Sequence, residues 1–252
     1  MARTAALAYH AVTDEWPNPL AVSIACFRAQ LHRLADRGLR GVTLADVARN
    51  AHRDEIGVTF DDGFASVATA AKPILDELGW KATVFVVTDF VGSAEPMLWL
   101  GGSKADHAGE RVPLRWDELH ALAAAGWEIG SHGRTHRLLS TLGERDLAHE
   151  LRTSKEALEG HGFECTSISY PYGELDDRVI DAAARVGYTV GSGLAGRFRQ
   201  TDPMCIPRVA VSGADGRLRF ALKTSPFFLA ARRTAAWSCL ESIRRAGHPL
   251  GI

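Results

Sequence analysis

The sequence predicts an α/β fold with parallel strands, and three observations support this prediction. Short apolar runs alternate along the chain with segments of helical periodicity, as in folds whose parallel strands are joined by helices. Three of the apolar runs end in polar residues, and barrels of parallel strands carry their chemistry at that end. The 252 residues suffice for one large domain with a substantial core. We therefore expect a single α/β domain with its reactive groups gathered at one end of the strands.

The composition narrows the class of protein. The 29 basic and 30 acidic residues give a formal net charge of −1, so the chain lacks the basic footprint of a nucleic-acid-binding protein. Neither DNA nor RNA is expected as a partner. The cysteines lie far apart, which argues against a disulfide framework or a thiolate zinc site and for reduced thiols. They are Cys26, Cys165, Cys205 and Cys239.

The first fifty residues predict two strands and two helices. The apolar run at 5–9 stops at His10 and is typical of a buried strand. Ser23 is a favoured helix cap, and apolar residues follow it at i, i+4 and i+7. These residues are Phe27, Leu31 and Leu34. A short strand at 42–44 and a short helix at 45–50 come next.

The middle of the chain repeats this alternation. An apolar strand at 56–60 precedes a helical face from Val67 to Leu78, and Pro73 must start, kink or divide that helix. The continuous apolar run at 82–87 suits a strand covered on both faces. Beyond residue 113 we expect helices at 116–125, 147–158 and 176–186, and strands at 127–129, 166–170, 188–191 and 206–211.

Residues 92–113 break this rhythm. Glycine, proline and scattered charge without a clear period are typical of either a disordered excursion or a lid over a site, and we favour the lid. Trp99 and Trp116 near its ends offer faces on which a sugar could stack, or serve equally as buried anchors.

Two adjacent carboxylates, Asp61 and Asp62, stand at the end of the strand at 56–60, followed by Gly63. Side chains alternate along a strand, so one Asp can be held by a cation while its neighbour stays free to accept a proton. Taken alone, Asp-Asp-Gly is more often only a turn with a capped helix behind it.

A second motif makes a metal site the better interpretation. His132 and His136 are spaced i and i+4, and on one helical turn two such side chains point the same way. Two imidazoles and a carboxylate form a ligand set typical of a catalytic zinc with an open position. Metal-assisted hydrolysis is the chemistry that this set favours.

Three motifs together resemble the polysaccharide deacetylases, the carbohydrate esterases with a NodB-type domain. They are Thr59 to Gly63 (TFDDG), Ser131 to His136 (SHGRTH) and Tyr170 to Gly173 (YPYG), in that order. Tyr9-His10 and Pro207-Arg208-Val209 are similar to the first and last strands of one branch of the family. The resemblance covers residues 5–211, and the combination is more specific than any single motif.

The resemblance implies an irregular (β/α) barrel of the NodB type. It implies Asp61 as general base, a metal-bound water as nucleophile, and Tyr172 as the donor of a backbone N–H to the oxyanion. The implied metal ligands are Asp62, His132 and His136. The ion is expected to be Zn²⁺, with Co²⁺, Mn²⁺ or Ni²⁺ as alternatives.

The chain departs from the family pattern in two places. The third motif usually begins with an arginine that orients the base, and here that position is Ser169. Arg208 is the best candidate to pair with Asp61 instead, against the alternative of an ordinary surface arginine. The late Leu-x-His motif that supplies the general acid is also missing. His10 could protonate the leaving amine, although a lone histidine at a strand end is more often structural.

We expect a barrel over residues 1–216 and a basic amphipathic tail over residues 217–252. The tail interleaves Lys and Arg with aromatic and aliphatic residues, so it could lie on an anionic membrane surface. A helix packed on the barrel with a solvated basic face is at least as good an interpretation.

The overall expectation is a metal-dependent N-deacetylase of an N-acetylated sugar or glycoconjugate. No export signal or membrane span is visible, which favours a cytoplasmic or membrane-peripheral protein and a lipid-linked, nucleotide-linked or secondary-metabolite amino sugar. One alternative is a hydrolase of another C–N bond, such as a formamide or cyclic ureide. A catalytically silent carbohydrate-binding barrel is the other, and retention of both aspartates and both histidines argues against it.

Overall fold

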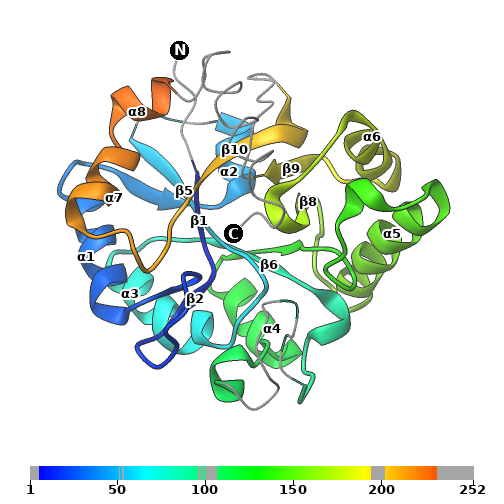
Figure 1. Cartoon of the computed structure of the whole chain (residues 1–252), viewed down its shortest axis with the longest axis horizontal. Helices are drawn as coiled ribbons and strands as arrows, with labels where there is room; N and C mark the ends of the chain where they lie inside the picture. The colour runs from blue at the N-terminus through cyan, green and yellow to red at the C-terminus, as the bar shows by residue number, and fades with distance from the viewer. Residues whose placement is uncertain are drawn as a thin grey trace.

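A computed structural model describes residues 6–50, 52, 54–95, 97, 99, 107–193 and 202–231. Seven parallel strands close into a barrel, because β1 pairs with both β10 and β5 (Figure 1). In chain order they are β1 (Ala6–Tyr9), β5 (Glu55–Phe60), β6 (Thr83–Val86), β7 (Glu128–Ser131), β8 (Ser167–Ser169), β9 (Val190–Gly193) and β10 (Ile206–Ala210). β4 (Arg40–Val42) pairs with the start of β5, and β2 (Ala11–Val12) pairs with β3 (Ala21–Val22). The predicted α/β barrel is confirmed.

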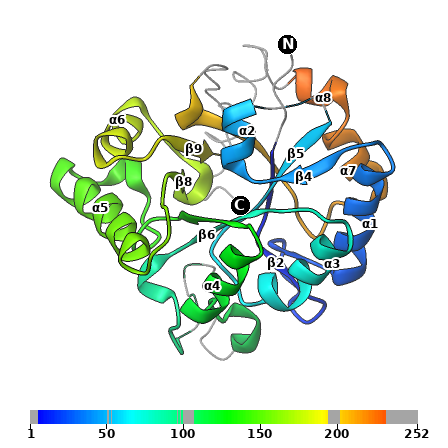
Figure 2. The ribbon, with the colours of Figure 1, turned by 180° about the vertical axis from the view of Figure 1, so that it is seen from behind.

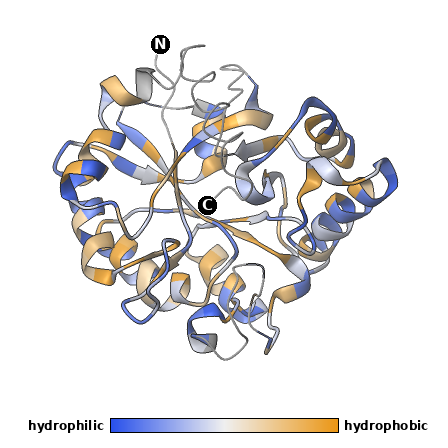
Figure 3. Cartoon of the chain, viewed as in Figure 1, coloured by the Kyte–Doolittle hydropathy of each residue, from blue (hydrophilic) through white to orange (hydrophobic). Residues whose placement is uncertain are grey.

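The helices surround this barrel, as the front and back views show (Figures 1 and 2). They are α1 (Ile24–Ala35), α2 (Leu44–Asn50), α3 (Lys72–Glu77), α4 (Trp116–Ala124), α5 (Glu144–Gly160), α6 (Asp177–Val186), α7 (Arg217–Lys223) and α8 (Pro226–Ala231). Each long helix buries an apolar stripe against the strands. On α5 that stripe is Leu147, Leu151 and Leu158, while hydrophilic residues line its outer face (Figure 3).

Local signals account for several element boundaries. Ser23 caps α1 by accepting a hydrogen bond from the Cys26 N–H at 3.2 Å, and the three predicted apolar residues of this helix are buried. Pro73 divides the next helix as expected, because a π-helical segment (Val67–Ala71) precedes it and Pro73 stands in the first turn of α3.

Several predicted boundaries differ from the observed ones by one to three residues, and β4 shows the clearest cause. The strand expected at 42–44 ends at Val42, and Leu44 already begins α2. The cause is a reciprocal cap, in which Thr43 Oγ1 accepts from the Asp46 N–H at 3.1 Å and the Asp46 carboxylate accepts from the Thr43 N–H at 3.3 Å. These two bonds turn the chain into a helix one residue after the strand.

The C-terminal end of the segment at 92–113 packs beside the turn that follows Asp61 and Asp62. Phe64 bridges Pro113, and the Leu114 N–H donates to the Gly63 carbonyl at 2.8 Å. Much of the expected lid, from 100 to 106, lies outside the described residues.

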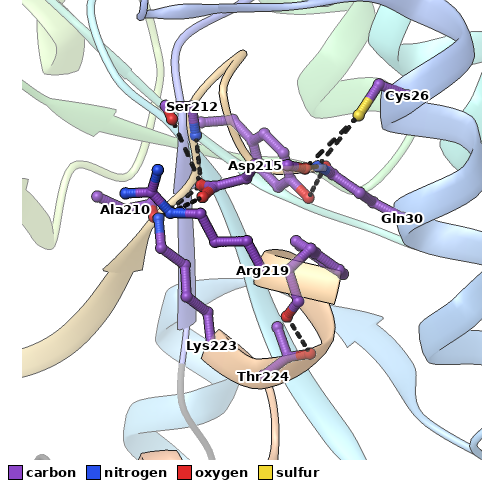
Figure 4. A network of polar contacts seen from close by, with 10 residues as sticks. Cys26, Gln30, Ala210, Ser212, Asp215, Arg219, Lys223 and Thr224 are labelled. Carbon is purple, nitrogen blue, oxygen red and sulfur yellow. Dashed lines mark hydrogen bonds and ion pairs between the residues drawn. The ribbon is translucent and has the colours of Figure 1, made fainter. Parts of the chain in front are cut away.

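A buried carboxylate, Asp215, fixes α7 to the barrel (Figure 4). Lys223 Nζ and Arg219 Nε lie 2.6 and 2.9 Å from its two oxygens, and the Ser212 N–H donates to it at 2.9 Å. Phe220 on the same helix enters the main hydrophobic core. The first turns of the tail therefore pack on the barrel, but two basic residues of α7 are bound to Asp215, which differs from the solvated basic face of the packing interpretation.

The outer side of α7 and α8 carries three large apolar side chains. Leu218, Leu222 and Phe227 are 86%, 58% and 81% exposed, more than any other large apolar residue of the described chain. Residues 232–252, the rest of the tail, lie outside the described residues, as does Cys239. The other three cysteines are free thiols. Within the described ranges, no helix has both the length and the apolarity needed to cross a membrane.

Candidate active site

The end of β5 sends its two carboxylates in different directions. The Asp61 N–H donates to the Tyr9 carbonyl at 2.9 Å, which extends the pairing of β1 with β5 by one step. Asp62 and Gly63 then both have positive φ, 67° and 72°. Position 63 requires glycine, since a Cβ there would lie 2.7 Å from Cγ1 of Val86. This left-handed turn separates the two carboxylates.

Asp61 forms a two-pronged ion pair with Arg208 of β10. Arg208 NH1 and NH2 donate to the two carboxylate oxygens at 2.7 and 2.8 Å, and both side chains are buried. The same guanidinium donates to Thr59 Oγ1 at 2.9 Å and to Ser169 Oγ at 2.7 Å. Ser169, at the position where the family pattern has arginine, thus holds the arginine that reaches in from another strand.

The charge state of Asp61 follows from this pair. Burial raises the pKa of Asp61, but the Arg208 charge and hydrogen bonds, together with His132 and His10, outweigh it and hold the pKa well below its ordinary value. Asp61 is therefore an ionised carboxylate whose orientation is fixed.

Asp62, His132 and His136 come together as a buried cluster. The Asp62 Oδ1 atom lies 3.2 Å from His136 Nε2 and 3.6 Å from His132 Nε2, and the three ligand atoms lie within 4.8 Å of one another. Asp62 Oδ1 makes no hydrogen bond although it is buried. A buried carboxylate oxygen facing two imidazole nitrogens suits a divalent cation, so the residues fit the metal that the resemblance implies.

The histidines converge for a reason other than the expected one. The prediction of a helical turn is wrong, because residues 132–138 form a loop with no helix, and Gly133 and His136 have left-handed φ values of 80° and 61°. The His132 N–H donates to the Val86 carbonyl at 2.8 Å, and Thr135 N–H donates to Glu150 at 2.6 Å. Neighbouring elements, rather than helical spacing, aim the two rings.

Glu150 of α5 is a site-supporting residue that the sequence analysis missed. It is buried, and its carboxylate accepts hydrogen bonds from both the backbone and the hydroxyl of Thr135. The available signal was an acidic residue on the apolar side of a helix, between Leu147 and Leu151.

His132 is held in the form that binds metal. Its Nδ1 lies 2.7 Å from the Ser169 carbonyl, which leaves Nε2 toward Asp62. Burial lowers the pKa of His132 to about 4, although Asp61 and Asp62 oppose that shift. Burial raises the pKa of Asp62, but contact with His136 and the nearby histidine charges outweigh it and lower the pKa. At neutral pH the cluster holds a neutral imidazole and an anionic carboxylate.

Tyr172 and His10 border this cluster. Tyr172 has φ 61° and ψ 5° inside a short turn (Pro171–Gly173), and its half-exposed ring meets the His136 ring edge to face at 4.7 Å. His10 follows β1 directly, and its buried Nδ1 has no hydrogen-bond partner. The residue before it, Tyr9, accepts a hydrogen bond from the Asp61 N–H, so His10 follows the strand end that lies beside the aspartates.

The two tryptophans of the expected lid differ in position. Trp99 stacks on His136, with ring centroids 4.6 Å apart and planes at 10°. Trp116 begins α4 and stacks on His161, which follows α5 and is not part of the cluster. Of these two tryptophans, Trp99 is the one that contacts a candidate metal ligand.

Comparisons with known proteins identify the family of the chain. The sequence profile described as polysaccharide deacetylase matches residues 48–191, more than half of the chain. YxkH of Bacillus subtilis is 26% identical over 192 residues, which make up 73% of this chain and 62% of YxkH. The poly-beta-1,6-N-acetyl-D-glucosamine N-deacetylase of Escherichia coli is 25% identical over 265 positions, covering 86% of this chain and 38% of that enzyme. The chain thus spans less than two thirds of either relative.

A solved structure supports the fold. The Streptococcus pyogenes deacetylase PplD, in complex with acetate, superposes with a TM-score of 0.74 and 21% identity, over 88% of this chain and 98% of that one.

Proposed function

Because the chain belongs to the polysaccharide deacetylase family, we propose that it removes the N-acetyl group from an amino sugar or glycoconjugate by metal-dependent hydrolysis. The observation that carries this proposal is the pairing of two adjacent aspartates with different partners. Asp61 is ionised and locked by Arg208, while Asp62 faces two histidines. A proton acceptor and a cation site therefore lie side by side.

Asp62, His132 and His136 would hold one divalent ion, with Zn²⁺ as our first choice and Co²⁺, Mn²⁺ or Ni²⁺ as alternatives. When bound, such an ion polarises the acetyl carbonyl and makes a water molecule more acidic. The groups that would act beside the ion, Asp61 and the Tyr172 N–H, belong to the protein.

Asp61 takes the proton of the attacking water in this proposal. Arg208 keeps its carboxylate ionised and prevents it from rotating away. Because a carboxylate of low pKa is a weak base, the bound ion would have to make the water acidic enough for this transfer. The water oxygen forms a bond to the acetyl carbon, and the Tyr172 N–H stabilises the resulting oxyanion. The C–N bond then breaks, His10 gives a proton to the departing amine, and acetate leaves.

The substrate class is proposed from the relatives. One relative is named for an N-acetylated glucosamine polymer, so a β-linked N-acetylglucosamine oligomer is the first candidate. The lipid-linked and nucleotide-linked amino sugars expected from the sequence stay as alternatives.

Acetate release from a panel of these compounds tests the activity. We expect at least one N-acetylated sugar to release acetate, and we expect a chelator to abolish and added Zn²⁺ to restore that release. Activity that survives complete metal removal would overturn the metal assignment. Release of formate or ring-opened ureide, with no acetate from any sugar, would favour a different C–N bond.

A cytoplasmic location with peripheral contact to an anionic membrane through residues 217–252 is also a proposal. It is supported by the three exposed apolar side chains of α7 and α8. Two basic residues of α7, Arg219 and Lys223, are already bound to Asp215. Arg217, the third basic residue of α7, is exposed, so any membrane affinity of α7 would combine apolar contact with the charge of this residue.

A further inference from the structure

The two histidines of the cluster are supported differently. His132 points its Nδ1 at the Ser169 carbonyl at 2.7 Å. The Nδ1 of His136 is buried and has no hydrogen-bond partner. Metal-binding histidines almost always use their second nitrogen in a hydrogen bond, which fixes the orientation of the ring. His136 lacks that support, and its backbone is in a left-handed conformation.

Aromatic rings surround His136 instead. Trp99 lies nearly parallel to it, with centroids 4.6 Å apart and planes at 10°, so the indole stacks on one face of the imidazole. Tyr172 and His132 approach at 70°, with centroids at 4.7 and 4.9 Å. A parallel stack restrains rotation of the imidazole out of its plane, and this keeps Nε2 directed at Asp62.

Trp99 is itself held in place from the barrel side. Phe90, which lies in the short turn after β6 (Thr88–Phe90), meets it edge to face with centroids 4.8 Å apart and planes at 84°. Trp99 also packs against a satellite core that includes Trp16, Phe64 and Met97. The indole is therefore a fixed surface against which a neighbouring ring can be aligned.

We propose that Trp99 is the positioning residue for His136, supplying by stacking the ring orientation that a hydrogen bond supplies for His132. This inference rests on the proposed metal site. It differs from the sugar-stacking interpretation, because the indole face toward His136 is occupied by the imidazole. A tryptophan that acts through His136 should change metal affinity, whereas one that only contacts sugar should change KM.

Zinc affinity, measured by competition with a chromophoric chelator, tests the proposal without using activity. Trp99→Leu keeps an apolar side chain but removes the plane, and we expect it to weaken Zn²⁺ binding by roughly 10-fold to 100-fold, the usual effect of losing an outer-shell partner. Trp99→Phe keeps a plane and should recover most of the affinity. Trp116→Leu removes the comparable stack on His161 and should leave affinity unchanged.

Activity gives a second readout. If Trp99 acts through metal affinity, saturating Zn²⁺ should restore much of the turnover of Trp99→Leu, with KM near that of the wild type. The melting temperature of each metal-free variant checks folding. Trp99→Met, also apolar and non-planar, replaces the leucine variant if that variant does not fold.

The outcomes separate the two proposals. Wild-type protein that binds no Zn²⁺ would overturn the metal site, and the role of Trp99 with it. Wild-type protein that binds Zn²⁺, with equal affinity in the leucine and methionine variants, would overturn the role of Trp99 alone. A raised KM at unchanged zinc affinity would also overturn it and make Trp99 a sugar contact.

Discussion

At the scale of single residues, the site depends on one buried ion pair. Arg208 makes four hydrogen bonds at once, two to Asp61 and one each to Thr59 and Ser169, and its side chain is fully buried. Breaking a buried pair by removing one partner leaves an uncompensated charge, which is strongly destabilising. A substitution at Asp61 must therefore be judged on metal content and stability as well as on rate.

Asp61→Asn gives the first prediction. The amide is nearly isosteric but cannot accept the proton of water, so turnover should fall by roughly 10²-fold or more. The metal content should stay at the wild-type level, because Asp61 is not among the three candidate ligands. Acetate release and metal analysis on one preparation measure both quantities. Near-normal turnover in this variant would mean that Asp61 is not the base.

His10→Ala tests the identity of the acid. If His10 protonates the departing amine, its loss should slow hydrolysis of an N-acetyl amide by roughly 10²-fold while sparing an acetyl ester with a phenolate leaving group, which needs no proton. Both rates are measured on the same variant. His120→Ala, which removes an exposed histidine, is the control. Equal losses on amide and ester would assign His10 a structural role.

At the scale of elements, the sequence predicts the order and type of most helices and strands, because apolar periodicity and caps act locally. It also places Asp61 and Asp62 after β5 and the two histidines after β7, and β6 lies between these two strands. The conformation of the histidine loop could not be predicted, since i and i+4 spacing says nothing of left-handed residues at 133 and 136. The stack on Trp99 is also long-range, and no local pattern encodes it.

Membrane contact through the exposed apolar side chains of α7 and α8 can be tested by substitution. Replacing Leu218, Leu222 and Phe227 together with Ser should reduce flotation with phosphatidylglycerol vesicles, because interfacial binding scales with buried apolar area. The melting temperature should hardly change, because all three side chains are exposed. Deleting the whole tail would be a poor test, since Phe220 belongs to the core.

Val112→Ser is the matched control, because Val112 is an exposed apolar residue outside α7 and α8. Equal flotation of the wild type and the triple variant would rule out membrane contact through these helices.

At the scale of the whole molecule, the free energy of unfolding of the metal-free protein should fall as the pH is lowered from 7 to 5. His132 has a folded pKa of about 4 against an ordinary 6.5, so the unfolded chain binds more protons between these values and stability falls as the pH falls. The expected loss is roughly 2 kcal/mol between pH 7 and pH 5. The lowered pKa of Asp61 acts in the same direction at more acidic pH.

Urea unfolding of chelator-treated protein at pH 7 and pH 5 measures this loss. His132→Asn removes the titrating ring and should flatten the pH dependence over the same interval. An unchanged free energy of unfolding across that interval in the wild type would show that His132 is not neutral in the folded protein.

The closure of the barrel by β1 has a consequence for how the protein is made. In the register of β1 with β10, Ala6 lies opposite Arg208, so the first strand of the barrel in chain order must wait for the last one. Contacts separated by so much chain are slow to form, and the ring stays open until β10 has been synthesised. Asp61 meets Arg208 only at that moment. A nascent or truncated chain that stops before β10 therefore has an open barrel, and its Asp61 lacks the arginine that orients it.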